Sequence, residues 1–364
     1  MRIVSVLFLS TILPTALGAQ LITSNTLSDT TAATRLATDD ADTINSSGDP
    51  FQQAQPTPPT TKPSKQKLPG PDEPPIKGSM VGYIDNAIVE NEIRIRFDAA
   101  FDNNFPDRAE FFYAQCGCDG GTARGPGPGL ATAVNFQQLY MRGEYAPIRR
   151  LSFLLDIPIR WLQPQSFAPQ TVTPAAPGFS SKAGLSDIQA GFKFALVRSE
   201  QFYLTFQFMT SLPSGDSTKG LGTAHASVAP SLLYFGKMTD RFSLEGQVGD
   251  THPIGGDTPG FPGDVFTYGI GPSYVLYYND KVSFTPVLEF VGWRVLGGMQ
   301  NNAALLSSPG LPIQSTNGIN IFNIKGGFRT AIGNHNSFYV GFGQAVTHQV
   351  WYKHIIRLEY RRTF

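Results

Sequence analysis

The chain has 364 residues, enough for two soluble domains, but only 15% of them are charged while 12% are aromatic. After the first twenty residues no apolar stretch is long enough for a spanning helix, which excludes a helical inner-membrane transporter. Lys plus Arg and Asp plus Glu number 28 each, so the net formal charge of zero gives no argument for nucleic-acid binding.

Residues 1–19 have the layout of a secretory signal peptide. Arg2 is followed by the apolar run 3–13 and then by small residues. This order predicts export with cleavage after Gly18 or Ala19. No cysteine follows the cleavage region, so we expect no lipid anchor there.

Residues 20–78 are rich in Thr, Ser, Asp, Gln and Pro, and end in two proline-rich stretches, 56–59 and 69–75. Such a composition buries too little apolar surface to offset its ordering entropy. We therefore expect a disordered periplasmic linker with a semi-rigid polyproline part. The alternative is a segment that docks to the cell wall or to a partner, for which composition alone carries no specificity.

Residues 79–364 are predicted to form an all-β domain of about twelve strands, each about ten residues long, as a tilted membrane strand requires. Apolar and polar residues alternate clearly in several of them: Ile93, Ile95 and Phe97 oppose Arg94 and Arg96. The expected strands are 92–101, 135–146, 150–162, 184–196, 202–212, 224–236, 241–250, 264–278, 281–296, 318–331, 337–346 and 351–364.

The connections separate a barrel from a soluble sandwich. Short turns alternate with long Gly/Pro-rich loops at 102–134, 163–183, 213–223, 251–263 and 297–317. Short periplasmic turns, long extracellular loops and an even strand number are typical of outer-membrane barrels. We therefore predict a transmembrane antiparallel up-and-down β-barrel in the cell outer membrane. Aromatic residues near strand ends suit interfacial girdles, with ordinary strand packing as the alternative: Trp161, Phe202, Tyr277, Tyr278, Trp293, Trp351 and Tyr352.

The last predicted strand ends on Phe364. At a period of two, Tyr352, Ile356, Leu358 and Tyr360 share its face, while charged residues, including Lys353 and Arg361, fall on the other face. Such a strand is expected to close the cylinder against the first strand and to be read by the barrel-assembly machinery. The expected partners are thus outer-membrane lipid, this machinery and a small-molecule solute, and no nucleic acid.

The same alternation places a set of charged side chains on the water-facing side of the wall. Each Arg or Lys on the lipid face near the midplane would cost about 2–4 kcal/mol, so these residues are expected to point into a polar lumen. The predicted lumen-lining residues are Arg94, Arg96, Arg142, Arg160, Lys193, Arg241, Glu245, Glu289, Lys325, Arg329, Arg357 and Glu359. Asp98, Glu144, Asp156, Asp187, Lys353 and Arg361 fall on the same side.

Mixed charges can line a narrow pore or fill it with ion pairs, and the sequence leaves both alternatives open. Pro158, Pro230 and Pro286 lie within predicted strands, where a missing N–H favours a bulge or kink. A kink in the wall could open a lateral exit to lipid, or could be local strain alone.

No constellation points to catalysis, and no cofactor or metal site is expected. The histidines His225, His252, His335, His348 and His354 show no metal-ligand spacing. The stretch 250–252, Asp-Thr-His, would suit a barrel hydrolase only with a matching nucleophile, and none can be named. Cys116 and Cys118 would close a very small, strained disulfide ring, which leaves a reactive, redox-labile or metal-binding loop as an alternative. A structural or incidental loop pair is the preferred interpretation.

The stretch 183–194, Ala-Gly-Leu-Ser-Asp-Ile followed by a strand that contains Lys193, leads to Ser-Leu-Pro-Ser-Gly at 211–215 and Gly-Leu-Gly-Thr at 220–223. This pattern resembles the outer-membrane proteins of the meta-pathway phenol-degradation family, a transporter-like group with Gly-Leu-Gly-Asp and Leu-Pro-Thr-Gly motifs. The likeness covers about the last half of the chain. It implies an outer-membrane barrel for uptake of aromatic or other hydrophobic compounds.

The predicted function is passive passage of small, hydrophobic or aromatic molecules through a barrel, and not an enzymatic reaction. A non-conducting structural or adhesion barrel with a salt-bridged lumen is the first alternative. A barrel hydrolase, which would need a nucleophile and base within about 3 Å at the rim, is the second.

Overall fold

The computed structural model describes residues 78–104, 131–167, 180–254, 263–301 and 313–364, all within one compact unit. The predicted signal peptide, almost all of the predicted linker, and Cys116 and Cys118 lie outside the described residues. Within these ranges the chain is almost entirely strand, with one short 3₁₀ helix, η1 (Ser217–Lys219).

The strands alternate with short turns and longer connections along the chain. Their bounds are β1 (Glu92–Asn103), β2 (Ala131–Ile148), β3 (Leu151–Phe167), β4 (Lys182–Leu185), β5 (Gln189–Arg198), β6 (Phe202–Ser211), β7 (Ala226–Lys237), β8 (Phe242–Ile254), β9 (Val265–Tyr274), β10 (Tyr277–Tyr278), β11 (Val282–Val295), β12 (Met299–Asn301), β13 (Ile313–Ser315), β14 (Asn320–Ile332), β15 (Asn336–Ala345) and β16 (His354–Thr363).

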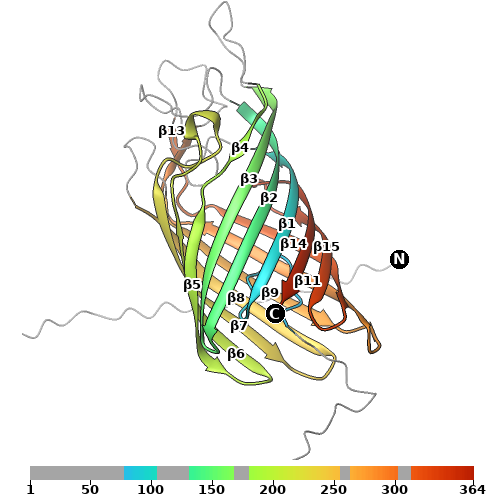
Figure 1. Cartoon of the computed structure of the whole chain (residues 1–364). Helices are drawn as coiled ribbons and strands as arrows, with labels where there is room; N and C mark the ends of the chain where they lie inside the picture. Colours follow the sequence, from blue (N-terminus) through green and yellow to red (C-terminus); the bar gives the residue numbers. More distant parts are fainter. Residues whose placement is uncertain (1–77, 105–130, 168–179, 255–262, 302–312) are drawn as a thin grey trace, which may run out of the picture. The chain divides into compact units, whose positions relative to one another are not determined.

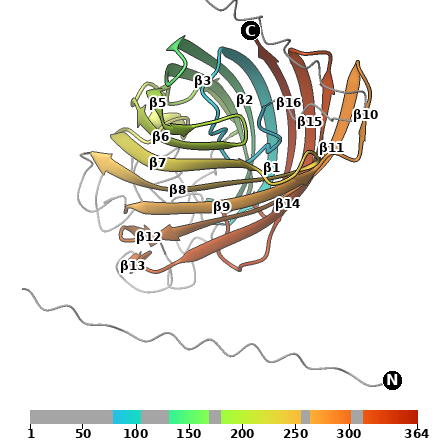
Figure 2. The same cartoon turned by 90° about the horizontal axis from the view of Figure 1, so that it is seen from below.

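The wall is a closed antiparallel barrel whose strands follow one another around the cylinder in chain order (Figures 1 and 2). β12 and β13 are not part of this wall and pair only with each other. β1 pairs with β16 from Glu92↔Thr363 to Phe101↔His354, which closes the cylinder. β4 and β5 share one place beside β3, β9 and β10 share one place beside β11, and β12 and β13 lie outside the wall, so the described residues form a barrel of twelve strand positions. The predicted fold, a twelve-stranded up-and-down barrel, is confirmed.

Two predicted strands are interrupted. The strand predicted at 184–196 is split into β4 and β5, because residues 186–188 leave the ladder. The strand predicted at 264–278 ends at Tyr274, and only Tyr277 and Tyr278 pair again, as β10. Short turns join strands at one end, which we call the short-turn end; the longer connections lie at the other, the long-loop end (Figure 1).

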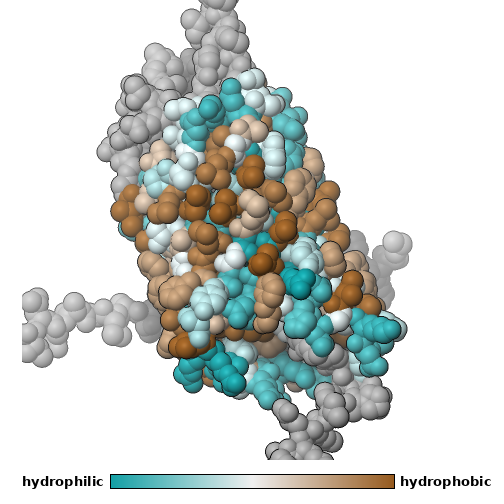
Figure 3. Space-filling model, in the orientation of Figure 1, coloured by the Kyte–Doolittle hydropathy of each residue, from teal (hydrophilic) through white to brown (hydrophobic). Residues whose placement is uncertain are grey.

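The two faces of the wall have opposite polarity. Large hydrophobic side chains such as Ile95, Phe153 and Phe328 are about half exposed on the outside, whereas the inward-facing charged residues are buried. Brown, hydrophobic residues cover much of the outer wall in Figure 3, and teal residues gather at the short-turn rim. A soluble protein has the opposite distribution of apolar and charged residues, so this distribution suits a lipid-facing exterior. None of the described residues forms a helix long and apolar enough to cross a membrane.

The last connection differs from its prediction. β16 begins at His354, so residues 346–353 are a loop and the period-two pattern does not extend to Tyr352. Trp351 and Tyr352 are therefore buried among inner aromatic residues and do not form part of a lipid-facing girdle, whereas Lys353 is exposed. From Ile356 onwards the predicted outer face is present, with Leu358 and Phe364 exposed.

The strand prolines have different effects. Pro158 and Pro286 keep their places in the ladders, opposite Tyr140 and Phe328. At Pro230 the ladder between β7 and β8 is interrupted, because the pairing passes from Val228↔His252 directly to Ser231↔Gly249. The predicted irregularity is thus present at Pro230, where the missing N–H removes a ladder bond.

Candidate functional site

Residues 79–91, here called the plug segment, precede β1 and lie inside the barrel (Figure 2). They form no strand, yet Met80, Val81, Ile84 and Ala87 are almost completely buried. Their polar contacts reach β2, β6, β8, β11, β14 and β16, which lie all around the wall. The plug segment therefore crosses the lumen.

Two wall carboxylates bind the backbone of the plug segment. The Glu289 oxygens accept hydrogen bonds from the N–H groups of Gly82 (2.9 Å), Tyr83 (2.8 Å) and Ile84 (2.8 Å). The Glu245 carboxylate accepts from the N–H groups of Met80 (2.7 Å) and Val81 (3.3 Å). A segment outside any sheet must satisfy its backbone elsewhere when buried, and here charged side chains do so.

Wall arginines bind the carbonyl groups of the same segment. Arg329 donates to the carbonyl oxygens of Met80 (2.8 Å) and Val81 (2.7 Å). Arg357 donates to that of Gly82 at 2.5 Å, and Arg361 to that of Ser79 at 3.0 Å. The first residues of the plug segment are thus held through both their backbone N–H groups and their carbonyl groups.

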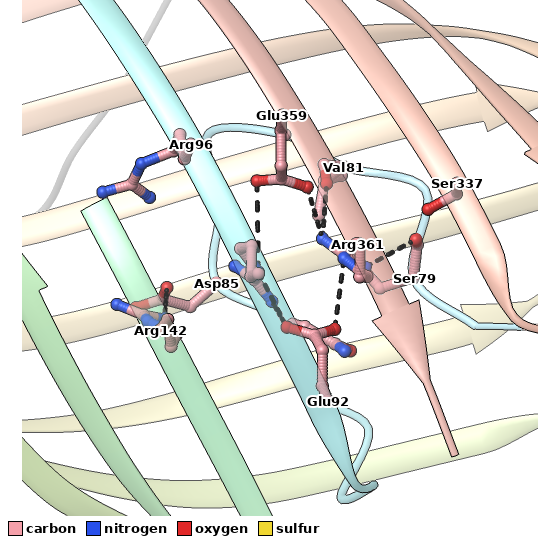
Figure 4. A network of polar contacts seen from close by, with 12 residues as sticks. Ser79, Val81, Asp85, Glu92, Arg96, Arg142, Ser337, Glu359 and Arg361 are labelled. Atoms are coloured by element: carbon pink, nitrogen blue, oxygen red, sulfur yellow. Dashed lines mark hydrogen bonds and ion pairs between the residues drawn. The ribbon is translucent and has the colours of Figure 1, made fainter. Parts of the chain in front are cut away.

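The arginines also join a network of ion pairs across β1, β14 and β16 (Figure 4). Glu359 lies 2.8 Å from Arg329 and 3.1 Å from Arg361. Glu92 pairs with Arg94 at 2.6 Å and with Arg361 at 3.1 Å. Because all of these side chains are almost fully buried, each charge needs its partners to offset the cost of leaving water.

A second group of charges lies beside β2 and β3. The Arg142 guanidinium contacts Asp156 at 2.9 Å and the plug residue Asp85 at 3.2 Å. Lys193 pairs with Glu144 at 2.7 Å, and both side chains are buried. The plug segment is therefore connected to both groups of charges.

Lys325 is a buried cation surrounded by aromatic rings. Its Nζ donates to the Tyr352 hydroxyl at 2.8 Å and lies 4.2 Å from the ring centroid of Tyr83 and 5.0 Å from that of Trp293. The Tyr83 ring, at the tip of the plug segment, also carries the Arg357 guanidinium 4.1 Å from its centroid. These cation–π contacts fasten the tip of the plug to the wall.

The structure brings most of the predicted lumen-lining residues together on the inner face. The buried ones are Arg94, Arg142, Lys193, Glu245, Glu289, Lys325, Arg329, Arg357 and Glu359. Arg96 and Arg160 are partly buried there; Arg96 lies over the Tyr140 ring and Arg160 donates to Gln138. Arg241 lies elsewhere: it is exposed in the short turn before β8, with its guanidinium 5.5 Å from the Tyr278 ring centroid.

Two adjoining cavities lie on the long-loop side of the plug segment. The larger, about 350 Å³, is lined by Arg160, Trp293 and Trp351 among others. The deeper one, about 200 Å³, reaches Asp85 and Arg142. They share Gln189, Ser211, Ser227, Thr251 and Thr267 as lining residues.

The opposite side of the plug segment has a separate cavity. About 260 Å³ in volume, it lies at the short-turn mouth against Ser79, Met80 and Glu90. Elsewhere along the plug segment, Ala87 packs against Leu233 and Phe235 of β7. The plug segment therefore separates the cavities at the two ends of the barrel.

The motifs behind the family resemblance meet at the long-loop end. Asp187 accepts hydrogen bonds from the N–H groups of Gly215 (2.9 Å) and Thr223 (2.8 Å). Ser214 accepts from the N–H of Ile188 at 2.8 Å. The three motif segments thus clamp one loop to the wall beside the larger cavity, which is a structural role for Asp187.

The stretch 250–252, weighed above for a barrel hydrolase, does not assemble a nucleophile. His252 Nδ1 lies 2.7 Å from the Asp264 carboxylate on an exposed part of the barrel. Within the described ranges His252 hydrogen-bonds to no serine, threonine or cysteine. The part of the chain that the structure describes also holds no group of three or more His, Cys, Asp or Glu residues arranged for a metal ion.

The plug segment was not predicted from the sequence. A signal for it exists, since 79–91 is the first part of the chain rich in apolar residues after the polar linker, yet it contains no strand alternation. An apolar stretch that adjoins the first strand but cannot join the wall has to bury its side chains either in the lumen or against lipid.

A closed barrel with an apolar exterior and a charged interior defines the class of the protein, a transmembrane antiparallel β-barrel. No protein-family model matches the chain, and no curated protein matches it. The resemblance to the phenol-degradation family therefore stays a prediction.

Several solved structures are similar to this chain. An outer membrane channel from Pseudomonas putida F1 has 12% sequence identity and a TM-score of 0.47, and the match covers 80% of this chain and 99% of the channel. The KdgM porin has 10% identity and a TM-score of 0.36, with 75% and 99% covered. The beta domain of the Bordetella autotransporter BrkA has 9% identity and a TM-score of 0.41, with 76% and 100% covered.

The stability of the folded protein is expected to depend on pH through Glu90 of the plug segment. Burial and the charge of Glu92 raise the pKa of Glu90 to about 7, from an ordinary value of 4.5. The folded protein thus retains a proton that the unfolded chain releases, so the free energy of unfolding falls as pH rises from about 4.5 to about 7.

Glu90→Gln should remove this fall. The stability of the variant relative to wild type should increase between pH 5 and pH 8, by at most about 3 kcal/mol. Denaturant unfolding of the detergent-folded barrel at both pH values measures the difference. A difference that is the same at both pH values would contradict the assignment.

Proposed function

We propose that the protein is an outer-membrane channel for small solutes, closed at rest by the plug segment. The observation that carries the proposal is a closed barrel whose inner face is polar and whose lumen holds cavities on both sides of one short segment. A lumen filled by wall side chains alone would need no such segment. Export by the predicted signal peptide and assembly through β16 belong to this proposal.

The proposed solutes are small and hydrophobic or aromatic, as the family resemblance implies. The ring centroids of Trp293 and Trp351 lie 4.7 Å apart beside the larger cavity, and Tyr140 also lines it. Such rings supply apolar contact area and stack on planar solutes. Passage would run from the long-loop end to the plug segment, whose displacement opens the route.

The second candidate, a non-conducting structural barrel, is favoured by one observation. Ion pairs between β1, β14 and β16 are buried and extensively connected, as a sealed lumen would require. The two candidates differ in whether the plug segment ever leaves its place.

Conductance in planar bilayers tests the proposal. The refolded mature protein should show rare, discrete openings, because the plug segment must first be displaced, and phenol should reduce the current through them. Heat-modifiable mobility on gels verifies that the barrel is folded. Complete silence from a folded barrel, together with silence from the plug variant described in the Discussion, would favour the structural candidate.

A further inference from the structure

We propose that the place held by the Asp85 carboxylate is a binding site for the carboxylate of a small organic acid. Arg142 and Gln207 are its donors, and a solute acid entering from the long-loop end competes with Asp85 for them. The inference rests on the proposed channel function and specifies a chemical group of its solutes.

Each oxygen of the Asp85 carboxylate accepts a hydrogen bond from its own side-chain donor. Arg142 donates to Oδ1 at 3.2 Å, and the side-chain amide of Gln207 donates to Oδ2 at 3.0 Å. The two donors belong to the wall, while Asp85 belongs to the plug segment. A carboxylate that arrives without the plug would find the same two donors, one for each oxygen.

The site is open on the side of the deeper cavity. The Asp85 side chain is 32% exposed, whereas the Arg142 side chain is 8% exposed and Gln207 is 3% exposed. All three residues line the 200 Å³ cavity. The carboxylate therefore lies between fixed, buried donors and a space that a small solute can enter.

Arg142 keeps its position when Asp85 leaves. Its Nε and one terminal nitrogen donate to Asp156 Oδ2 at 3.0 and 2.9 Å, and the other terminal nitrogen donates to Asp85 Oδ1. The guanidinium is thus oriented from the wall, and Arg142 lines the cavity. Since a buried donor left without a partner is costly, a solute carboxylate can offset the loss of Asp85.

The charge around the site favours an anion. Burial alone would raise the pKa of Asp85, but Arg142, Gln207 and more distant cations outweigh it, so the pKa lies well below its ordinary value. Asp250 also lines the cavity, and its negative charge disfavours an acid with two charges. A monocarboxylate fits this balance best.

The approach to the site carries a further cation. Arg160 lines the larger cavity and donates from Nε to Gln138 at 3.2 Å. Between the two cavities the shared lining residues are uncharged amides and hydroxyl groups, with Gln189 and Thr267 among them. A carboxylate entering from the long-loop end thus meets one arginine before it reaches the next.

Calorimetric titration of the detergent-folded full chain tests the inference. Benzoate and its neutral analogue benzamide serve as probes because they differ in charge and not in shape. Asp85→Asn removes the charge of the internal competitor, so benzoate should bind about tenfold more tightly to this variant than to wild type, with benzamide unchanged. Gln207→Leu in the Asp85→Asn background should reverse the gain, because it removes one donor.

Asp216→Asn is the matched control, since this carboxylate lies in the exposed loop of η1 and pairs with Lys219. It should leave both affinities unchanged. Equal affinities for benzoate and benzamide in Asp85→Asn, or an equal benzoate affinity in Asp85→Asn and Asp216→Asn, would overturn the site. Benzoate binding without any conductance would reject the channel but retain the site, whereas conductance without a preference for benzoate would reject only the site.

Discussion

A barrel that carries Gly82→Val is expected to open far more often than the wild-type protein. A Cβ atom at position 82 would overlap the ring of Tyr339. This ring is 1% exposed and its hydroxyl donates to Glu289 at 3.2 Å, so it has little room to move. The added side chain should therefore push the tip of the plug segment away from the Glu289 carboxylate, while every wall charge stays in place.

Overpacking of this kind costs about 1–3 kcal/mol. It should increase the ratio of open to closed channels by about tenfold or more, because about 1.4 kcal/mol corresponds to a factor of ten. Single-channel recording in planar bilayers measures the open fraction directly.

Gly143→Val provides the control for this substitution. Gly143 lies in β2, and a Cβ atom there would meet nothing within 4 Å. The control should therefore fold and conduct like wild type. If Gly82→Val also leaves the open fraction unchanged in a folded barrel, displacement of the plug tip is not the opening step.

Asp98→Ala should destabilise the barrel strongly, by about 3–5 kcal/mol. Asp98 in β1 binds Arg357 in β16 through both oxygens, at 2.7 and 2.6 Å, and thus links the two strands that close the cylinder. Both side chains are buried, so removing the carboxylate leaves an uncompensated positive charge. Urea unfolding of the detergent-folded protein measures the loss.

The double variant Asp98→Leu/Arg357→Leu tests the reason for this loss. Because it removes both charges and fills the space with apolar groups, it should be much less destabilised than the sum of the two single variants. Additive losses would show that the contacts of Arg357 with Gly82 and Tyr83 matter more than the ion pair.

Strand placement was largely predictable from local pattern. Alternation in β1 put Ile93 and Ile95 outside and Arg94 inside, and the structure agrees. Such a pattern is readable because a period of two assigns each side chain to one face of the wall. The pattern misled where the chain leaves the ladder, as at Arg241 in a short turn and at Tyr352 and Lys353 in the last loop.

The sequence by itself determined the barrel, its alternating loops and the charged character of its interior, because lipid outside and water inside impose a local rule on every strand. Only the tertiary structure decided what fills that interior. The plug segment carries no periodicity, and its place depends on Glu245, Glu289 and Arg329, which lie more than 160 residues further along the chain. Such contacts arise when the closed wall brings distant donors and acceptors around one short segment, so no local pattern predicts them.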